Sequence, residues 1–204
     1  MISHALLAQE QDQPKPLHFD LTPLLGYRTS ITFTGQPGIE GVTPRVVLEA
    51  SPSYGFAFGV RLDEEDLIEF RWARQNTHTQ VEGAIVVPST QHATLDQFHG
   101  DFTHEYIFEQ WHGRTRAFVM ASVGGTHVSG SADTSSFTRF SFGIGGGFKI
   151  FPNRHIGFRI QAEWLPVWVN PEVNAFICGA GCIVHLGGTL SSQGEVSLGP
   201  VLRF

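Results

Sequence analysis

The sequence predicts an all-β fold, an eight-stranded antiparallel up-and-down transmembrane β-barrel that occupies residues 17–204. Three observations predict it. Short runs of alternating apolar and other residues are separated by Gly, Pro, Asn and Asp, which is typical of strands and turns. One face of these runs is bulky and apolar, whereas the other carries small residues and isolated charges. The connections between the runs alternate between long and short, as in membrane barrels.

Eight strands are expected in chain order, at residues 18–28, 54–62, 67–75, 97–110, 116–126, 138–151, 156–167 and 195–204. Even-numbered strands end in short turns, at 63–66, 111–115 and 152–154. Odd-numbered strands are followed by longer segments, at 34–51, 76–94, 127–136 and 170–194. Membrane barrels gather their short turns at one end, and an even strand number places both ends of the barrel chain there.

The alternation favours a barrel in lipid over a soluble one. In the strand at 138–151, the bulky face holds Phe140, Phe142, Ile144, Phe148 and Ile150. The opposite face holds Arg139, Ser141, Gly143, Gly145, Gly147 and Lys149. A soluble β-sandwich or lipocalin-like barrel also has many short strands. It would bury the bulky face, however, and an eight-stranded lumen is only just wide enough for side chains.

Composition and charge bound the function. A length of 204 residues suits one domain, and no stretch approaches 18 consecutive apolar residues, so we expect no transmembrane helix. The net charge of −6, without a basic cluster, argues against a nucleic-acid partner. The ten histidines do not match metal-ligand spacing. The glycines from Gly143 to Gly147 lie inside an expected strand rather than before a helix, so we expect no cofactor.

Residues 1–16 are expected to be a signal remnant or a disordered lead-in. Ala8, followed by Gln9, resembles the last residue removed with a secretion signal, but the basic start and long apolar stretch of a complete signal are missing. Near the other end of the chain, Cys178 and Cys182 are separated by Gly-Ala-Gly. This close pair is too small for a zinc site and favours a local disulfide in an oxidising compartment, with two reduced thiols as the alternative.

The Phe142–Lys149 stretch, a tight turn and Gly157-Phe158-Arg159 resemble the penultimate hairpin of OmpA/OmpX-like outer-membrane β-barrel domains. The terminal Phe204, on an alternating strand, resembles the signal that the barrel-insertion machinery reads. The resemblance covers about residues 17–204. It implies insertion in the bacterial outer membrane, in contact with its lipid and lipopolysaccharide, but no single activity. Pro200 departs from the pattern, because it removes a hydrogen-bond donor from the last strand.

Fourteen charged residues fall on positions expected to face the lumen. The acids are Asp20, Glu69, Asp101, Glu105, Glu109, Glu163 and Glu195, and the bases are Arg28, Arg61, Arg71, Arg139, Lys149, Arg159 and Arg203. Balanced charge predicts a paired network that plugs the lumen, because unpaired buried charge is costly. A narrow pore for small solutes is the alternative, although a selective pore usually carries one sign. Within the network, we expect Arg71 to pair with Glu105, joined by Glu69 or Arg159.

His127 and Ser129 are candidate catalytic residues. Their spacing resembles that of the lipid A deacylases, in which a His activates a Ser, and residues two apart in a strand share a face. A third group would have to orient the histidine, and no carboxylate is uniquely placed by the sequence to do so. The sequence therefore favours a structural role, or an interaction with an extracellular ligand through the long loops, over enzymatic activity. A lipid hydrolase is the second alternative.

Overall fold

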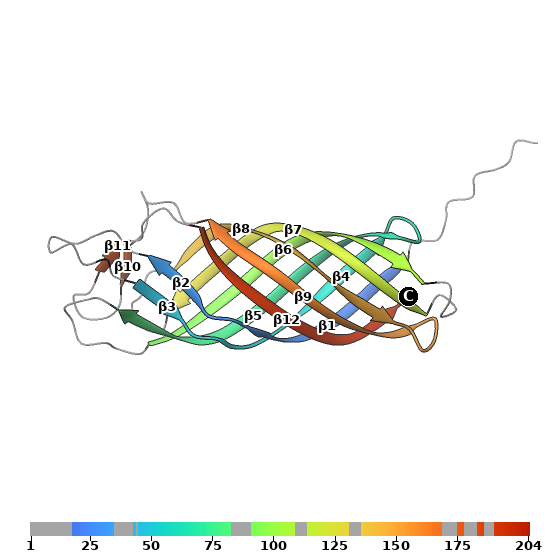
Figure 1. Ribbon diagram of the computed structural model, residues 1–204, viewed down its shortest axis with the longest axis horizontal. Helices are drawn as coiled ribbons and strands as arrows, with labels where there is room; N and C mark the ends of the chain where they lie inside the picture. Colours follow the sequence, from blue (N-terminus) through green and yellow to red (C-terminus); the bar gives the residue numbers. More distant parts are fainter. Residues whose placement is uncertain are drawn as a thin grey trace, which may run out of the picture.

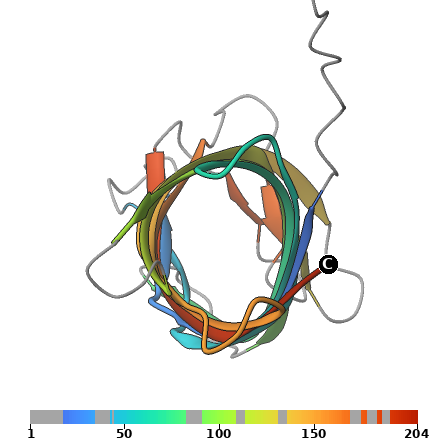
Figure 2. The same cartoon turned by 90° about the vertical axis from the view of Figure 1, so that its right-hand side faces the viewer.

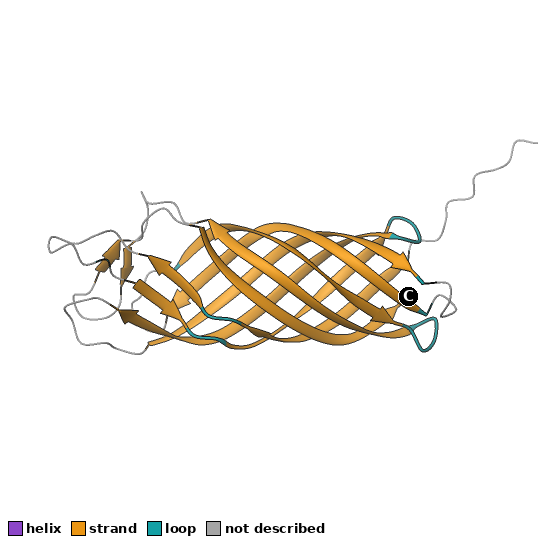
Figure 3. Cartoon of the chain, in the orientation of Figure 1, coloured by secondary structure: helices purple, strands orange, loops and turns teal. Residues whose placement is uncertain are grey.

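The computed structural model describes residues 18–34, 43, 45–82, 91–108, 114–130, 136–168, 175–177, 183–185 and 190–204. No helix among them is long or apolar enough to cross a membrane. The described parts are strands and their connections (Figure 3). The lead-in expected at 1–16, the disulfide expected between Cys178 and Cys182, and Glu109 all lie outside these residues, so those expectations stay predictions.

Eight strands form the barrel wall (Figure 1). In chain order they are β1 (Phe19–Arg28), β4 (Ser51–Arg61), β5 (Asp66–Glu82), β6 (Gln91–Ile107), β7 (Thr115–Gly130), β8 (Phe137–Ile150), β9 (Ile156–Trp168) and β12 (Leu190–Arg203). Each strand pairs antiparallel with its neighbours, in the order β5-β4-β1-β12-β9-β8-β7-β6, and the pairing of β5 with β6 closes the ring (Figure 2). The predicted eight-stranded antiparallel barrel is confirmed.

Four shorter strands lie beyond one end of this ring. β2 (Ile31–Thr34) and β3 (Arg45–Leu48) pair with each other, and β3 also pairs with β5, so they extend the wall. β10 (Ala175–Ile177) and β11 (Ile183–His185) form a separate two-stranded sheet. We call the end of the barrel at which these four strands lie the outer end. The inner end carries the turn at 62–65, the turn at 152–155 and the adjacent Phe19 and Phe204.

The side chains alternate between lumen and exterior as the sequence predicted. On β9, every second residue from Gly157 to Leu165 is buried, and those between are exposed. Bulky apolar side chains are exposed on all eight wall strands, including Leu25, Phe58, Phe70, Phe102, Val123, Phe140, Ile160 and Leu198. Because such a belt is unfavourable in water and favourable in hydrocarbon, the exterior is lipid-facing.

The lumen side is less uniformly polar than expected. Leu67, Phe118, Met120 and Val201 are buried there among the charges. Phe118 has a structural reason to point inward, because the Arg159 guanidinium lies 4.7 Å and the Lys149 ammonium 5.3 Å from the centre of its ring. Cation–π contact of this kind stabilises cations that have left water. Gly143 also behaves as a lumen residue, since an added Cβ would lie 2.5 Å from Oε1 of Glu163.

The strands extend further outward than the sequence predicted. Segments 34–51 and 76–94 were expected to be connections, but they contain β3, the outer end of β5 and the first residues of β6. The outer extension comprises β2, β3 and the outer ends of the neighbouring wall strands. Its exterior positions become polar, as at Arg74 and Asn76, whereas its lumen positions are apolar on β2, β3 and β6 but stay polar on β5, at Gln75, Thr77 and Thr79. The lumen cluster comprises Ile31, Phe33, Val46, Leu48, Ala93, Leu95, Val128 and Val167.

Two prolines interrupt the seam between β1 and β12. Phe19 and Phe204 exchange both backbone hydrogen bonds, so every second residue along β1 occupies a hydrogen-bonding position toward β12. Pro23 and Pro200 face each other at one such position, and the recorded register stops at Leu21–Leu202 and resumes at Leu25–Leu198. Neither proline has an N–H to donate. The departure noted at Pro200 therefore weakens pairing with β1, whereas pairing with β9 continues through it.

Candidate functional site

A chain of ion pairs crosses the middle of the lumen. Arg71 on β5 donates Nε to Oδ2 of Asp101 on β6 at 2.8 Å and its terminal nitrogens to Glu163 on β9. Nδ1 of His99 lies 3.3 Å from the same guanidinium, and its Nε2 lies 2.8 Å from Oγ of Ser141 on β8. Four strands from different sides of the ring are thus joined through one buried arginine.

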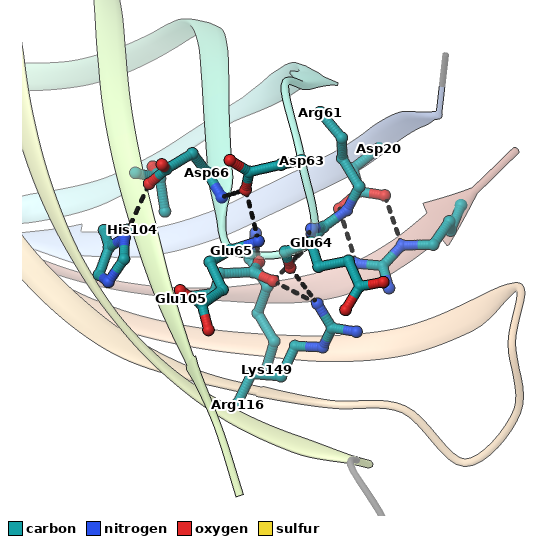
Figure 4. A network of polar contacts seen from close by, with 12 residues as sticks. Asp20, Arg61, Asp63, Glu64, Glu65, Asp66, His104, Glu105, Arg116 and Lys149 are labelled. Atoms are coloured by element: carbon teal, nitrogen blue, oxygen red, sulfur yellow. Dashed lines mark hydrogen bonds and ion pairs between the residues drawn. The ribbon is translucent and has the colours of Figure 1, made fainter. Parts of the chain in front are cut away.

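A second layer lies nearer the inner end. Glu69 accepts hydrogen bonds from Arg159 at 2.7 Å and from Thr103 at 2.8 Å. Glu105 is shared by three cations: it accepts hydrogen bonds from Arg61 and, at 2.9 Å, from Arg116, and Nζ of Lys149 lies 2.7 Å away (Figure 4). Glu69, Glu105 and Arg159 are almost completely buried. The structure therefore brings all six expected network residues into the lumen as paired charges.

The specific pairing of Arg71 with Glu105 is wrong. In the β5–β6 register, Arg71 lies opposite His99. His99 is six residues from Glu105 along β6, which corresponds to roughly 20 Å. The backbone N–H of Glu105 instead bonds the carbonyl of Glu65 in the turn at the inner end. The prediction assumed that neighbouring strands begin at equal height. Strands in a closed barrel are tilted and staggered, so their ends are not level.

The outer part of the lumen changes from charged to apolar. Glu195 accepts hydrogen bonds from Nε of Arg28 and Oγ of Ser53, both at 2.7 Å. Gln193 then donates to Gln75 at 2.9 Å. Beyond these amides lies the lumen cluster of apolar residues, which includes Phe33 and Leu95. The interior is therefore occupied by charged, then amide, then apolar side chains from the inner to the outer end.

His127 and Ser129 lie on the exterior of β7, on either side of the buried Val128. Nδ1 of His127 lies 2.9 Å from Oγ1 of Thr138 on β8, and the structure records no hydrogen bond between His127 and Ser129. Asp96 stands opposite His127 in the β6–β7 register. Its carboxylate accepts two hydrogen bonds from Arg74, at 2.7 and 2.8 Å, and one from Trp72. The one carboxylate across from the histidine is thus held by other groups.

Sequence reasoning missed several members of these sites, among them Arg116 and Asp96. Arg116 faces the lumen, as do Phe118 and Met120 on the same side of β7, so the period of two would have found it. Asp96 lies on the exterior parity of β6, next to the lipid-facing Phe98. An acid at such a position indicates the end of the apolar band. Its pairing with Arg74 could not be predicted, because that pairing depends on the strand register.

No protein-family model and no curated protein matches the chain. Its structure resembles that of the outer membrane protein OprG from Pseudomonas aeruginosa, with a TM-score of 0.64, 9% identity, and coverage of 92% of this chain and 95% of that one. It also resembles Neisserial surface protein A (TM-score 0.59, 11% identity, 91% and 97% covered). The outer membrane protein AlkL, solved in DMPC bilayers, gives a TM-score of 0.59 at 11% identity, with 92% and 90% covered. At these identities the likeness establishes the fold.

The closed ring, the apolar exterior and the charged lumen define an outer-membrane β-barrel protein. This class agrees with the OmpA/OmpX-like resemblance of the sequence and with the expected location in the bacterial outer membrane. Outer-membrane barrels turn their short connections toward the periplasm, so the inner end is the periplasmic end.

Proposed function

We propose that this barrel has a filled, non-conducting lumen and acts as a structural or interaction protein through its outer extension. The observation that carries the proposal is the order in which charged and apolar side chains fill the lumen from the inner to the outer end. Arg71, Glu69 and Glu105 each join several strands, and an apolar cluster follows at the outer end. A water-filled pore would instead need a continuous polar path.

The exterior of the outer extension supports the interaction role. Arg74, Asn76 and His78 on β5 project outward beyond the apolar band. This arrangement leaves a polar surface that a protein or carbohydrate could contact. Contact with lipopolysaccharide and with an extracellular ligand remains a proposal. The same holds for recognition of Phe204 by the insertion machinery, although that residue is exposed at the periplasmic end.

Planar-bilayer recording tests the filled lumen. Purified protein should give no unitary currents under conditions in which a known porin conducts. The matched variant is Arg159→Gln, which removes one cation of the buried layer and leaves the exterior unchanged. Unitary currents from the unsubstituted protein, with a conductance that changes in Arg159→Gln, would favour the narrow pore instead.

A second assay addresses the hydrolase alternative. Purified protein incubated with lipopolysaccharide should release no more fatty acid than its Ser129→Ala variant, because His127 bonds Thr138 and Asp96 is held by Arg74. Release that both His127→Ala and Ser129→Ala abolish would contradict the proposal and establish a catalytic pair on the exterior.

A further inference from the structure

The periplasmic mouth of the barrel is an open cavity of about 890 Å³. Five arginines line it: Arg61, Arg114, Arg116, Arg154 and Arg203. The acidic side chains that line it are Asp63 and Glu64, and the terminal residue Phe204 lines it as well. Oδ1 of Asp63 accepts hydrogen bonds from the backbone N–H groups of Glu65 and Asp66 in its own turn (Figure 4).

Positive charge is also in excess behind this lining. Arg61, Arg116 and Lys149 share the carboxylate of Glu105, and Lys149 also lies 3.9 Å from Glu69, which binds Arg159. Arg203 and Arg61 share that of Asp20, at 2.8 and 3.8 Å. Five cations therefore meet three buried carboxylates. At mid-lumen the balance is reversed, since Arg71 alone faces both Asp101 and Glu163. The buried layer next to the periplasmic mouth therefore holds more cations than carboxylates.

Two guanidinium nitrogens at the mouth form no hydrogen bond among the described residues. Nε of Arg61 and Nε of Arg116 are buried without a hydrogen-bond partner, and the Arg61 side chain is only 6% exposed. The exposed Arg114 and Arg154 form no ion pair in the described part of the chain. Buried donors of this kind normally find an acceptor, and a guanidinium fork matches the oxygens of carboxylates and phosphates.

An aromatic ring fixes two of these cations. The Arg203 guanidinium lies 4.0 Å and that of Arg116 lies 5.8 Å from the centre of the Phe151 ring. Phe151 is itself buried, with its ring against Gly157, where an added Cβ would lie 2.6 Å from it. Holding two guanidinium groups in advance reduces the entropy that a ligand must overcome on binding.

We propose that this periplasmic cavity binds an oxyanion that carries two or more negative charges, of phosphate or carboxylate chemistry. Arg114 and Arg154 on the rim would bind this oxyanion together with Arg116 and Arg203, which lie beside Phe151. Its volume is within the range of cavities that hold small organic ligands and is larger than one inorganic ion requires. The proposal is independent of what the outer extension contacts.

Isothermal titration of the full chain in uncharged micelles tests the site, with pyrophosphate and citrate as probes. We expect saturable binding of at least one probe, weakened by added salt. Binding of pyrophosphate alone would identify a phosphate ligand, and binding of citrate alone a carboxylate ligand. Arg114→Gln and Arg154→Gln should each weaken binding about two- to fivefold, the range for an exposed ion pair.

Arg45→Gln is the matched control, because it removes the same charge from an exposed residue at the opposite end of the barrel. It should leave the affinity unchanged. The rim variants are exposed and should not alter folding, which the mobility shift between unheated and heated samples on a gel verifies. Absence of saturable binding by both probes would overturn the proposal, as would an equal loss of affinity in Arg45→Gln.

Discussion

At the scale of single residues, the lumen is organised by cations and carboxylates that are shared among several partners. Arg71 serves two carboxylates, whereas Glu105 serves three cations. The period of two was enough to predict that these side chains face inward, and every expected lumen acid within the described residues is buried. Their partners could not be predicted, because partners depend on strand stagger and on which strands face one another across the ring.

The shared Arg71 gives a prediction for stability. Arg71→Met should lower the free energy of unfolding in micelles by about 3–5 kcal/mol, because it leaves the carboxylates of Asp101 and Glu163 buried without their cation. Adding Glu163→Gln should recover part of this loss, which a double-mutant cycle measures.

The control cycle pairs Arg71→Met with Glu105→Gln. These residues lie in different layers, so their effects should be additive within about 0.5 kcal/mol. A strong coupling between Arg71 and Glu105, with none between Arg71 and Glu163, would contradict the observed pairing.

At the scale of elements, the outer ends of β5 and β6 show why strand ends were harder to predict than strands. On β5, apolar Phe70 and Trp72 face outward and are followed on the same parity by Arg74 and Asn76. From Arg74 to Thr79 both parities of β5 are polar, and the apolar lumen residues at this level lie on other strands, as Leu95 does on β6. A segment without alternation between apolar and polar residues resembles a connection. The sequence therefore predicted a loop at 76–94, whereas the described residues of this segment lie in β5 and β6.

The seam between β1 and β12 carries a second prediction. Pro200→Val should raise the temperature at which the barrel unfolds in micelles by about 2–4 °C, since it restores an N–H at an interrupted position of the seam and a hydrogen bond contributes about 1 kcal/mol. The midpoint of the heat-induced mobility shift on a gel measures this change.

Leu198→Val is the control for that experiment. It places the same side chain two residues away on the lipid-facing side, without adding a donor. It should leave the midpoint unchanged or slightly lower. A decrease in Pro200→Val larger than that in Leu198→Val would show that the missing donor does not limit the stability of the seam.

At the scale of the whole molecule, two interiors of opposite chemistry share one wall. The membrane part has a charged lumen and an apolar exterior, whereas the outer extension has a cluster of apolar side chains in its lumen and polar residues such as Arg74 and Asn76 on its exterior. The membrane part was predicted from sequence because its alternation is regular over many residues. The extension was not, because β2 and β3 are short, and their apolar residues resemble those of any loop that packs inward.

A cavity created by mutation in one of these two parts of the lumen should destabilise that part without destabilising the other. Leu95→Ala removes a fully buried side chain from the apolar cluster of the extension, a change that typically costs about 2–5 kcal/mol. Hydrogen–deuterium exchange should show lost protection at residues 76–82 and 91–95, with little change in the heat-induced mobility shift. Leu67→Ala, a matched change at the periplasmic end, should lower the shift midpoint instead. Equal effects of both variants on both measurements would mean that the barrel unfolds as one unit.

The facing prolines of β1 and β12 also bear on how the barrel assembles. Before the ring closes, these two strands are the edges of an open sheet, and an open edge with a continuous row of N–H donors is a template for pairing with another chain. Pro23 and Pro200 each remove a donor from the side of the strand that is then unpaired, while the donors toward β4 and β9 remain. The same interruption that weakens the finished seam therefore protects the unfinished sheet from joining a second copy of itself.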